Sequence, residues 1–195
     1  MKRFFIIAAM LLSLQGCFFV AGAAAGAAGV AVVYDHRKLE KIMLDQHITN
    51  AINDKIKAAA ELADSGHIEV TCFNQVVLLT GETTSAALRQ QAEAIAHSVP
   101  DVNRIYNQIT VKGPVSSLTR ASDSWITTKI KTQMLATKGL QSGTIKVITE
   151  NGSVYLMGIV SHDQADMSVD IARQVSGVQK VVKIFKYMSE PQAVN

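Results

Sequence analysis

The sequence of 195 residues lacks most features shared by disulfide-linked, metal-dependent or nucleic-acid-binding proteins. Its two cysteines exclude a disulfide framework. The five histidines show no close ligand spacing, no CxxC or HExxH motif occurs, and no glycine-rich loop opens a helix to cradle phosphate. The net charge of +3 is too small to indicate a nucleic-acid partner. We therefore expect no catalytic residues, no metal, no cofactor and no nucleic acid.

The residues that come nearest to catalytic or metal-binding groups have simpler explanations. Cys72 lies within an apolar strand pattern and is expected to be an inert core or edge thiol. Asp163, Asp166 and Asp170 share one helix face, which is typical of a solvated surface. His97 follows a core position and is expected to face solvent. What the chain does have is hydrophobic residues, 48% of the total, which is enough for a packed core.

The amino-terminal residues 1–16 read MKRFFIIAAMLLSLQG and have the pattern of an export signal. Lys2 and Arg3 form a charged start, an apolar run follows, and the segment ends next to Cys17. The closing residues LQGC resemble the bacterial lipobox, whose cysteine receives a diacylglycerol group. We expect a lipoprotein signal peptide at 1–16 and lipidation of Cys17, which argues against a Cys17–Cys72 disulfide. The alternative is an ordinary signal peptide with a chance cysteine.

Residues 17–38 are rich in alanine and glycine and are expected to form a lipidated tether. Phe18 follows the cysteine. In lipoproteins of this kind an aspartate there would favour the inner membrane, so Phe18 is compatible with the outer membrane. The glycines make the stretch a poor isolated helix in water. If the signal were not cleaved, residues 4–33 would be long enough to span a membrane.

Two stretches of the chain, 48–111 and 126–188, repeat one pattern of apolar residues. Ile48 and Ile52 match Ile126 and Ile130 at a spacing of 78 residues, and the spacing falls to 77 and then to 76 further along. Each change falls between expected elements, where loops tolerate a difference in length. The repeat predicts two small domains of the same fold.

Each copy reads as helix, strand, strand, helix and strand. In the first copy these elements are expected at 46–62, 68–73, 76–81, 84–99 and 102–111. In the second copy they are expected at 123–137, 144–149, 153–160, 161–176 and 178–188. Tight turns at Asn74-Gln75 and Asn151-Gly152 join the strands of each hairpin, and Asn-Gly is the stronger signal of the two.

The ends of the helices and the connection between the copies also follow from local sequence. Ser122 or Asp123 is expected to cap the first helix of the second copy. Ser161-His162-Asp163-Gln164 has the pattern of a capping box that opens the second helix. Residues 112–121 contain glycine, proline and serine and are expected to be the linker. Residues 189–195 form a tail without a visible role.

The helix expected at 123–137 carries two different faces. Ile126, Ile130 and Met134 form an ordinary core stripe. The opposite face holds the only tryptophan, and its residues are Trp125, Thr128, Thr132 and Leu135, flanked by Lys129 and Lys131. A large aromatic residue beside lysines, opposite a core stripe, is typical of a helix that lies on an anionic membrane surface. The alternative is that Trp125 packs against another part of the protein.

The repeated order of elements resembles the BON domain over nearly all of residues 46–188. A glycine closes the second strand of each hairpin, and a Gly-Val or Pro-Asp-Val sequence precedes the third. The local motifs that carry the resemblance are WITTK at 125–129, TENG at 149–152, LMG at 156–158 and VSGV at 175–178. The resemblance implies an α+β fold with BON domains at 39–111 and 122–188. Each would be αββαβ, with two helices packed on one face of a small three-stranded sheet.

The resemblance also implies a function. It implies an outer-membrane lipoprotein that faces the periplasm, has no enzymatic activity and supports envelope integrity, with a link to cell division. It implies that anionic phospholipid such as phosphatidylglycerol binds through the first helix of the second BON domain. The expected lipid-binding residues are Trp125, Leu135, Thr128, Lys129, Lys131 and Thr132. The alternative is a periplasmic protein–protein module or chaperone that assists the outer-membrane assembly machinery.

The two copies differ on the surface that corresponds to this face. At the spacing of 78, Trp125, Thr128, Lys129, Thr132 and Leu135 correspond to His47, Asn50, Ala51, Asp54 and Lys57. Residues 46–111 contain four basic and seven acidic residues, whereas 124–188 contain eight basic and four acidic residues. Anionic lipid attracts a basic surface and repels an acidic one. The second copy is therefore the better membrane candidate, unless the difference is a chance divergence between duplicated domains.

Overall fold

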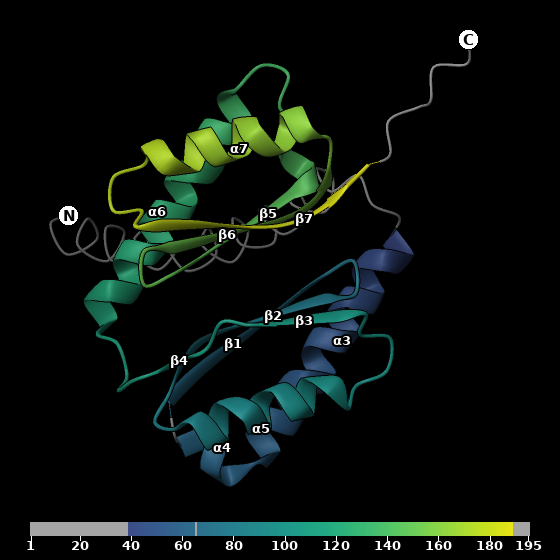
Figure 1. The fold of residues 1–195 in the computed structure, drawn as a ribbon, viewed down its shortest axis with the longest axis vertical. Helices are drawn as coiled ribbons and strands as arrows, with labels where there is room; N and C mark the ends of the chain where they lie inside the picture. The colour runs from purple at the N-terminus through teal and green to yellow at the C-terminus, as the bar shows by residue number, and fades with distance from the viewer. Residues whose placement is uncertain (1–38, 65, 189–195) are drawn as a thin grey trace, which may run out of the picture. The chain divides into compact units, whose positions relative to one another are not determined.

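The computed structural model describes residues 39–64 and 66–188, and Figure 1 shows their fold. The described part contains two α+β units, and in each unit the helices cover one face of a small sheet. The expected signal peptide at 1–16, the lipidated Cys17, the tether at 17–38 and the tail at 189–195 lie outside the described residues. Those four expectations therefore stay predictions.

The first unit begins with two helices and ends in a strand made of two pieces. Its elements are α3 (Leu39–Ala58), α4 (Ala60–Asp64), β1 (Gly66–Phe73), β2 (Val76–Thr83), α5 (Ala86–His97), β3 (Arg104–Asn107) and β4 (Thr110–Val111). β1 pairs antiparallel with β2, and β3 and β4 pair parallel with β2. The last strand is interrupted because Asn107 Oδ1 accepts a hydrogen bond from Ile109 N and the Ile109 side chain joins the core.

The second unit repeats this order. Its elements are α6 (Ser117–Ala136), the 3-10 turn η2 (Ser142–Thr144), β5 (Ile145–Glu150), β6 (Ser153–Val160), α7 (His162–Gln174) and β7 (Lys180–Tyr187). β6 lies between β5, which is antiparallel to it, and β7, which is parallel. The expected α+β class and the expected order of elements are confirmed in both units.

Both hairpins turn through two residues in the left-handed region, as a two-residue hairpin requires. The φ angles are 51° at Asn74 and 63° at Gln75, and 49° at Asn151 and 71° at Gly152. The turns expected from the sequence are therefore confirmed. Gln75 is an unusual residue for such a conformation, so its backbone needs support from outside the turn.

Helix α6 begins earlier than the sequence analysis expects. Its N-cap is Ser116, whose Oγ accepts a hydrogen bond from Thr119 N, and the helix starts at Ser117. The predicted cap at Ser122 or Asp123 is wrong, because the helix already runs through the second half of the expected linker. α6 therefore has about two more turns at its amino-terminal end than the pattern of core residues indicated.

The other helices agree with the bounds expected from the sequence to different degrees. Helix α3 begins at Leu39 instead of residue 46 and ends at Ala58, where the short α4 takes over. Helix α7 begins as expected, because Ser161 Oγ accepts a hydrogen bond from Gln164 N. The other half of the capping box is absent. The Gln164 side chain instead bonds to the backbone of residues 139 and 141 and holds the loop that follows α6.

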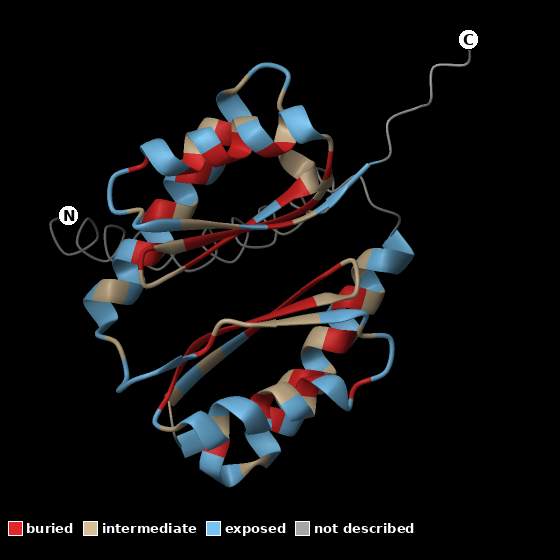
Figure 2. Ribbon diagram, viewed as in Figure 1, coloured by how far each residue is buried: buried red, intermediate tan, exposed pale blue. Residues whose placement is uncertain are grey.

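Each unit buries the stripe of its first helix against its own sheet, as the burial colours in Figure 2 show. The expected stripes are confirmed: Ile48, Ile52 and Ile130 are 0% exposed, and Ile126 and Met134 are 1% exposed. Full burial of such a side chain contributes about 1.5–3 kcal/mol. These stripes fix which side of each helix faces the core and therefore which side is left outside.

The remaining faces of the two sheets contribute to a third apolar cluster. Its buried members are Phe73, Leu78, Ile148, Tyr155, Met157 and Ile184. Each sheet thus has apolar contacts on both faces, and β2 and β6 are buried along almost their whole length. This explains why neither strand shows the simple alternation of a sheet with one solvated face.

Candidate functional site

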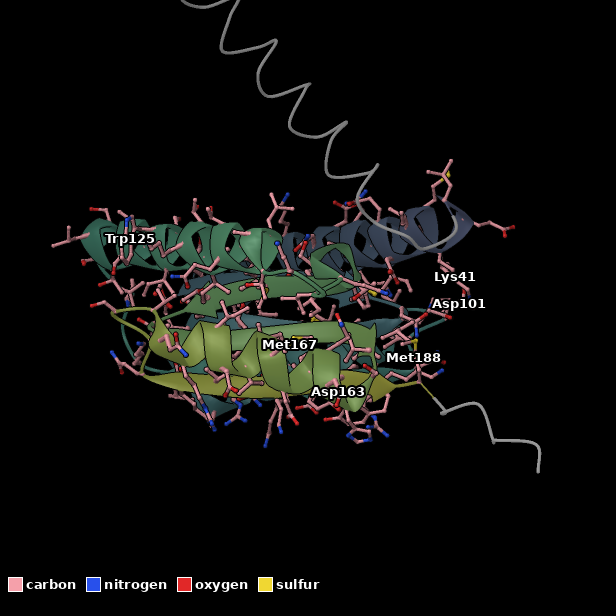
Figure 3. The ribbon with its side chains drawn as sticks, turned by 90° about the horizontal axis from the view of Figure 1, so that it is seen from above. Lys41, Asp101, Trp125, Asp163, Met167 and Met188 are labelled. Atoms are coloured by element: carbon pink, nitrogen blue, oxygen red, sulfur yellow. The ribbon has the colours of Figure 1, made fainter. Side chains whose placement is uncertain are left out.

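The outer side of helix α6 carries a row of exposed apolar residues. Leu118 is 79% exposed, Trp125 is 54% exposed and Leu135 is 62% exposed. Thr128 and Thr132 are exposed on the same helix. These five residues are called the α6 outer face, and Figure 3 labels Trp125 on this helix. Because more than half of Trp125 is open to solvent, the alternative in which it packs into another described part of the protein does not hold.

Leu118 is a member of this face that the sequence analysis missed. It lies seven residues before Trp125, and in a helix that spacing places both side chains on the same side, two turns apart. It was missed because the helix was expected to start at 123. The signal was present in the sequence: Ser116 and Thr119 form an N-cap pair that places Leu118 in the first turn.

The threonines of the α6 outer face, and the neighbouring Ser124, direct their hydroxyl groups to their own helix. Ser124 Oγ donates to Arg120 O at 3.0 Å, Thr128 Oγ1 donates to Ser124 O at 2.9 Å, and Thr132 Oγ1 donates to Thr128 O at 2.9 Å. Removing water from a hydroxyl group costs less free energy when that group is already hydrogen-bonded to a backbone carbonyl. The face is therefore more apolar in effect than its two threonines suggest.

Two lysines accompany this face. Lys129 and Lys131 are both exposed, and Lys129 lies one turn after Trp125. Long lysine side chains extend along apolar surface and keep the ammonium group in water. The structure therefore places all six expected lipid-binding residues on the exposed surface of one helix.

A buried aspartate fixes α6 to its sheet. Asp123 is 6% exposed, and its carboxylate accepts hydrogen bonds from Asn151 N at 2.8 Å and from Gly152 N at 2.9 Å. A carboxylate that bonds two backbone amides of a turn holds both elements firmly. Trp125 follows only two residues later, so the clamp helps to set the direction in which the tryptophan faces.

The first unit has the same clamp, which the sequence analysis also missed. Asp45 stands 78 residues before Asp123, and its carboxylate accepts hydrogen bonds from Asn74 N at 2.7 Å and from Gln75 N at 2.8 Å. These bonds supply the support that Gln75 needs at its positive φ. The matching positions of the two aspartates in the repeat were the available signal.

The outer side of α3 differs from that of α6. His47, Asp54 and Lys57 are exposed and polar. Its large exposed apolar residues are confined to the start of the helix, where Leu39 is 62% exposed and Met43 is 65% exposed. The middle and end of α3 therefore offer no counterpart to Trp125 and Leu135.

The acidic groups near the clamp of the second unit influence one another. Glu150 ends β5 and is partly buried. Burial raises the pKa of Glu150 from 4.5 to about 7, and the neighbouring carboxylates of Glu82 and Asp123 contribute to this increase. Glu150 therefore changes its charge close to neutral pH, a few residues from the turn that Asp123 holds.

The remaining candidates for chemistry are structural or solvated. Cys72 is 2% exposed, its Sγ donates to Asp45 at 3.3 Å, and burial raises its pKa to about 12. The expected core position of this thiol is thereby confirmed, and its expected inertness stays a prediction. Asp163, Asp166 and Asp170 are exposed on α7, as expected. Within residues 39–64 and 66–188, no group of three acidic, histidine or cysteine residues is placed to hold a metal ion.

One shallow depression borders the start of the α6 outer face and measures about 510 Å³. Lys112, Ser122 and Asp123 are among the residues that line it. Both oxygens of Asp123 are committed to the hairpin turn, so the depression contains one cation and hydroxyl groups but no free general base. No helix among the described residues is long and apolar enough to cross a membrane.

Comparison with known proteins gives matches along most of the chain. The family model of the BON domain matches residues 44–113 and 122–188. The outer membrane lipoprotein DolP of Haemophilus influenzae is 33% identical over 188 residues, which cover 96% of this chain and 97% of that protein. The 21 kDa hemolysin of Actinobacillus pleuropneumoniae is 35% identical over 144 residues, 74% of each chain. The osmotically-inducible protein Y of Escherichia coli is 33% identical over 138 residues, 68% of this chain and 69% of that protein.

Proposed function

This chain belongs to the BON-domain family as an outer-membrane lipoprotein that faces the periplasm, and on that premise we propose that its second unit binds anionic phospholipid through the α6 outer face. The observation that carries the proposal is the exposure of Leu118, Trp125 and Leu135 along one helix beside Lys129 and Lys131. An aromatic residue and flanking lysines suit the boundary between lipid headgroups and acyl chains. Phosphatidylglycerol supplies the negative charge that the lysines require.

The strength expected of this contact is modest. Each well-placed lysine gains up to about 1 kcal/mol near an anionic surface. The apolar residues add a similar contribution by partial burial, at about 25 cal/mol per Å² removed from water. A surface helix of this kind therefore selects a lipid headgroup without anchoring the protein by itself.

The anchor in this proposal is the lipid on Cys17. Several acyl chains, each gaining about 0.8 kcal/mol per buried CH₂ group, hold a protein far more firmly than a surface helix. The anchor also keeps α6 at a high effective concentration next to the bilayer, so that a weak contact is occupied much of the time. The protein would then support envelope integrity as a lipid-binding component, without catalysing a reaction. The link to cell division remains part of the same proposal.

Co-sedimentation of residues 35–195 with vesicles tests the proposal, because this fragment lacks the lipid anchor. We expect binding to vesicles that contain phosphatidylglycerol, weak binding to zwitterionic vesicles, and loss of most of the difference at high salt, where charges are screened. Equal binding to both vesicle types, or none to either, would contradict lipid selection by α6.

A second candidate function is a protein–protein contact that assists outer-membrane assembly. The observation that favours it is the pair Leu39 and Met43, which is exposed at the start of α3 in the acidic unit. An acidic unit is repelled by an anionic membrane, so an apolar pair there suits a protein partner better than a lipid. Crosslinking from position 43 in intact cells would capture such a partner, and a crosslink to lipid alone would remove this candidate.

A further inference from the structure

Glu82 of the first unit reaches the connection that leads into α6. It lies on β2 and is 0% exposed. Its Oε1 accepts a hydrogen bond from Val115 N at 3.1 Å and lies 3.6 Å from Arg120 Nη2. Val115 belongs to the expected linker, and Arg120 lies in the first two turns of α6. One carboxylate of the first unit therefore contacts the chain on both sides of Leu118.

The position of this carboxylate is costly for a protein that needs only a stable fold. Removing a charged group from water costs several kcal/mol unless hydrogen bonds and an opposite charge compensate for it. Glu82 has one ion pair, to an arginine side chain that is 47% exposed, and its Oε2 has no hydrogen-bond partner among the described residues. Burying an incompletely compensated charge weakens the fold, which suggests a purpose other than packing.

The internal repeat shows what the fold accepts at these two positions. Glu82 follows Gly81 as Ile159 follows Gly158, at the spacing of 77. Arg120 corresponds to Ile42 at the spacing of 78 that relates the first helices. Each residue of this ion pair therefore has an isoleucine at the equivalent position of the other unit. The BON fold does not need a charge at either position.

We propose that Glu82 is a positioning residue for the lipid-binding surface: it holds the linker and the first two turns of α6 and thereby sets the direction of Leu118. This inference rests on the proposed function of α6. Asp123 holds the helix from its own sheet, at the end of the second turn. Glu82 holds the part of the helix that precedes Asp123. The first unit thus supports the membrane contact without touching lipid itself.

Amide hydrogen exchange of the full lipidated chain in zwitterionic nanodiscs tests this role without requiring lipid binding by α6. Glu82→Gln keeps an oxygen that accepts from Val115 N but removes the charge opposite Arg120. We expect residues 119–122, whose amides are hydrogen-bonded, to exchange about tenfold faster in this variant, while residues 126–136 and helix α3 are unchanged. Glu69→Gln is the matched control, because Glu69 is an exposed carboxylate on the neighbouring strand β1.

A double substitution separates positioning from simple damage. Glu82→Ile combined with Arg120→Ile gives each position the isoleucine of its equivalent in the other unit, so that neither partner of the ion pair is left without the other. We expect the double variant to exchange more slowly at 119–122 than Glu82→Ile alone, because it leaves no unpaired arginine, although Val115 N has lost its acceptor in both variants. Unchanged exchange in Glu82→Gln, faster exchange throughout both units, or no recovery in the double variant would each overturn the role of Glu82.

A second readout connects the same variants to lipid. The emission of Trp125, the only tryptophan, should shift to shorter wavelength when nanodiscs contain phosphatidylglycerol, and Glu82→Gln should reduce that shift by about half. If the parent protein shows no shift, the proposed function of α6 fails while the exchange result still decides the role of Glu82. If the parent shifts and Glu82→Gln shifts as much, the positioning inference alone fails.

Discussion

The two BON units of this chain share their buried residues and differ in what they present to the outside. Both pack an isoleucine stripe of the first helix on a mixed sheet, and both hold the hairpin turn with a buried aspartate from that helix. On the outer sides, Trp125 and Leu135 of the second unit stand where the first unit has His47 and Lys57. The shared fold depends on the core and clamp, so the outer sides can differ without changing the fold.

The largest loss of stability should be the same in both units, because each unit has its own aspartate clamp of the same kind. Asp45→Ala and Asp123→Ala each remove a carboxylate that accepts two backbone amides, and charged hydrogen bonds of this kind contribute about 1.5–3 kcal/mol each. We expect each variant to lower the free energy of unfolding by about 3 kcal/mol, measured by urea denaturation. Asp163→Ala, at an exposed position, should change it by less than about 0.5 kcal/mol. A loss below about 1 kcal/mol in only one unit would break the equivalence.

The next largest effect is on lipid binding, and it should appear only when the second unit is changed. Trp125→Ala should weaken binding to phosphatidylglycerol vesicles about tenfold, because the tryptophan contributes the largest apolar area of the α6 outer face. His47→Ala, at the equivalent exposed position of the first unit, should leave binding unchanged. Both variants should keep the parent's free energy of unfolding within about 0.5 kcal/mol. Vesicle titration measures this contrast, and an equal loss in the two variants would contradict the assignment to α6.

The charge difference between the units should have a smaller and salt-dependent effect. Lys129→Gln with Lys131→Gln should weaken binding to anionic vesicles roughly fivefold at low salt and very little at high salt. Lys55→Gln with Lys57→Gln removes the same charge from α3 and serves as the control. If the α3 pair weakened binding as much as the α6 pair, net charge rather than the α6 outer face would determine the affinity.

The smallest effect concerns pH and also separates the units, because Glu150 corresponds to Phe73 at the spacing of 77. Burial first, and then neighbouring carboxylates, raise the pKa of Glu150 from 4.5 to about 7. The folded protein therefore holds this proton more tightly than the unfolded chain does. The stabilisation it contributes is complete below pH 4.5 and is lost as the pH rises through about 7.

Because Glu150 is partly exposed, we expect a loss on the order of 1 kcal/mol across this range. Glu150→Gln should flatten the dependence, measured as the free energy of unfolding at several pH values. The same slope in the variant and in the parent would assign the pH dependence to other groups.

The sequence was a good guide wherever one residue pattern determined one structural outcome. The stripe of Ile126, Ile130 and Met134 has the helical period and is buried as predicted. The Asn151-Gly152 turn follows from its two residues alone. Trp125 could be placed on the outside because a helix cannot turn both of its faces to one sheet.

The sequence was a poor guide where a side chain had several possible partners. Aspartate is a common N-cap residue, but the carboxylate of Asp123 is bonded to a hairpin turn 28 residues away. Gln164 completes a capping-box pattern, yet its side chain bonds to the loop after α6. The choice between these partners depends on which segments the fold brings together, and local sequence does not contain that information. Leu118 was missing from the proposed lipid-binding surface for a related reason, since its helix was expected to start at the wrong cap.

The most direct test compares the depth of the two first helices at a membrane with one tryptophan in each. The parent fragment 35–195 reports from Trp125, and the His47→Trp, Trp125→Phe variant reports from the equivalent position of the first unit. Both are mixed with phosphatidylglycerol vesicles whose acyl chains carry bromine, which quenches tryptophan emission at short range. We predict strong quenching in the parent and little in the variant. Equal quenching of both, or stronger quenching of the variant, would contradict the claim that the second unit alone presents the lipid-binding surface.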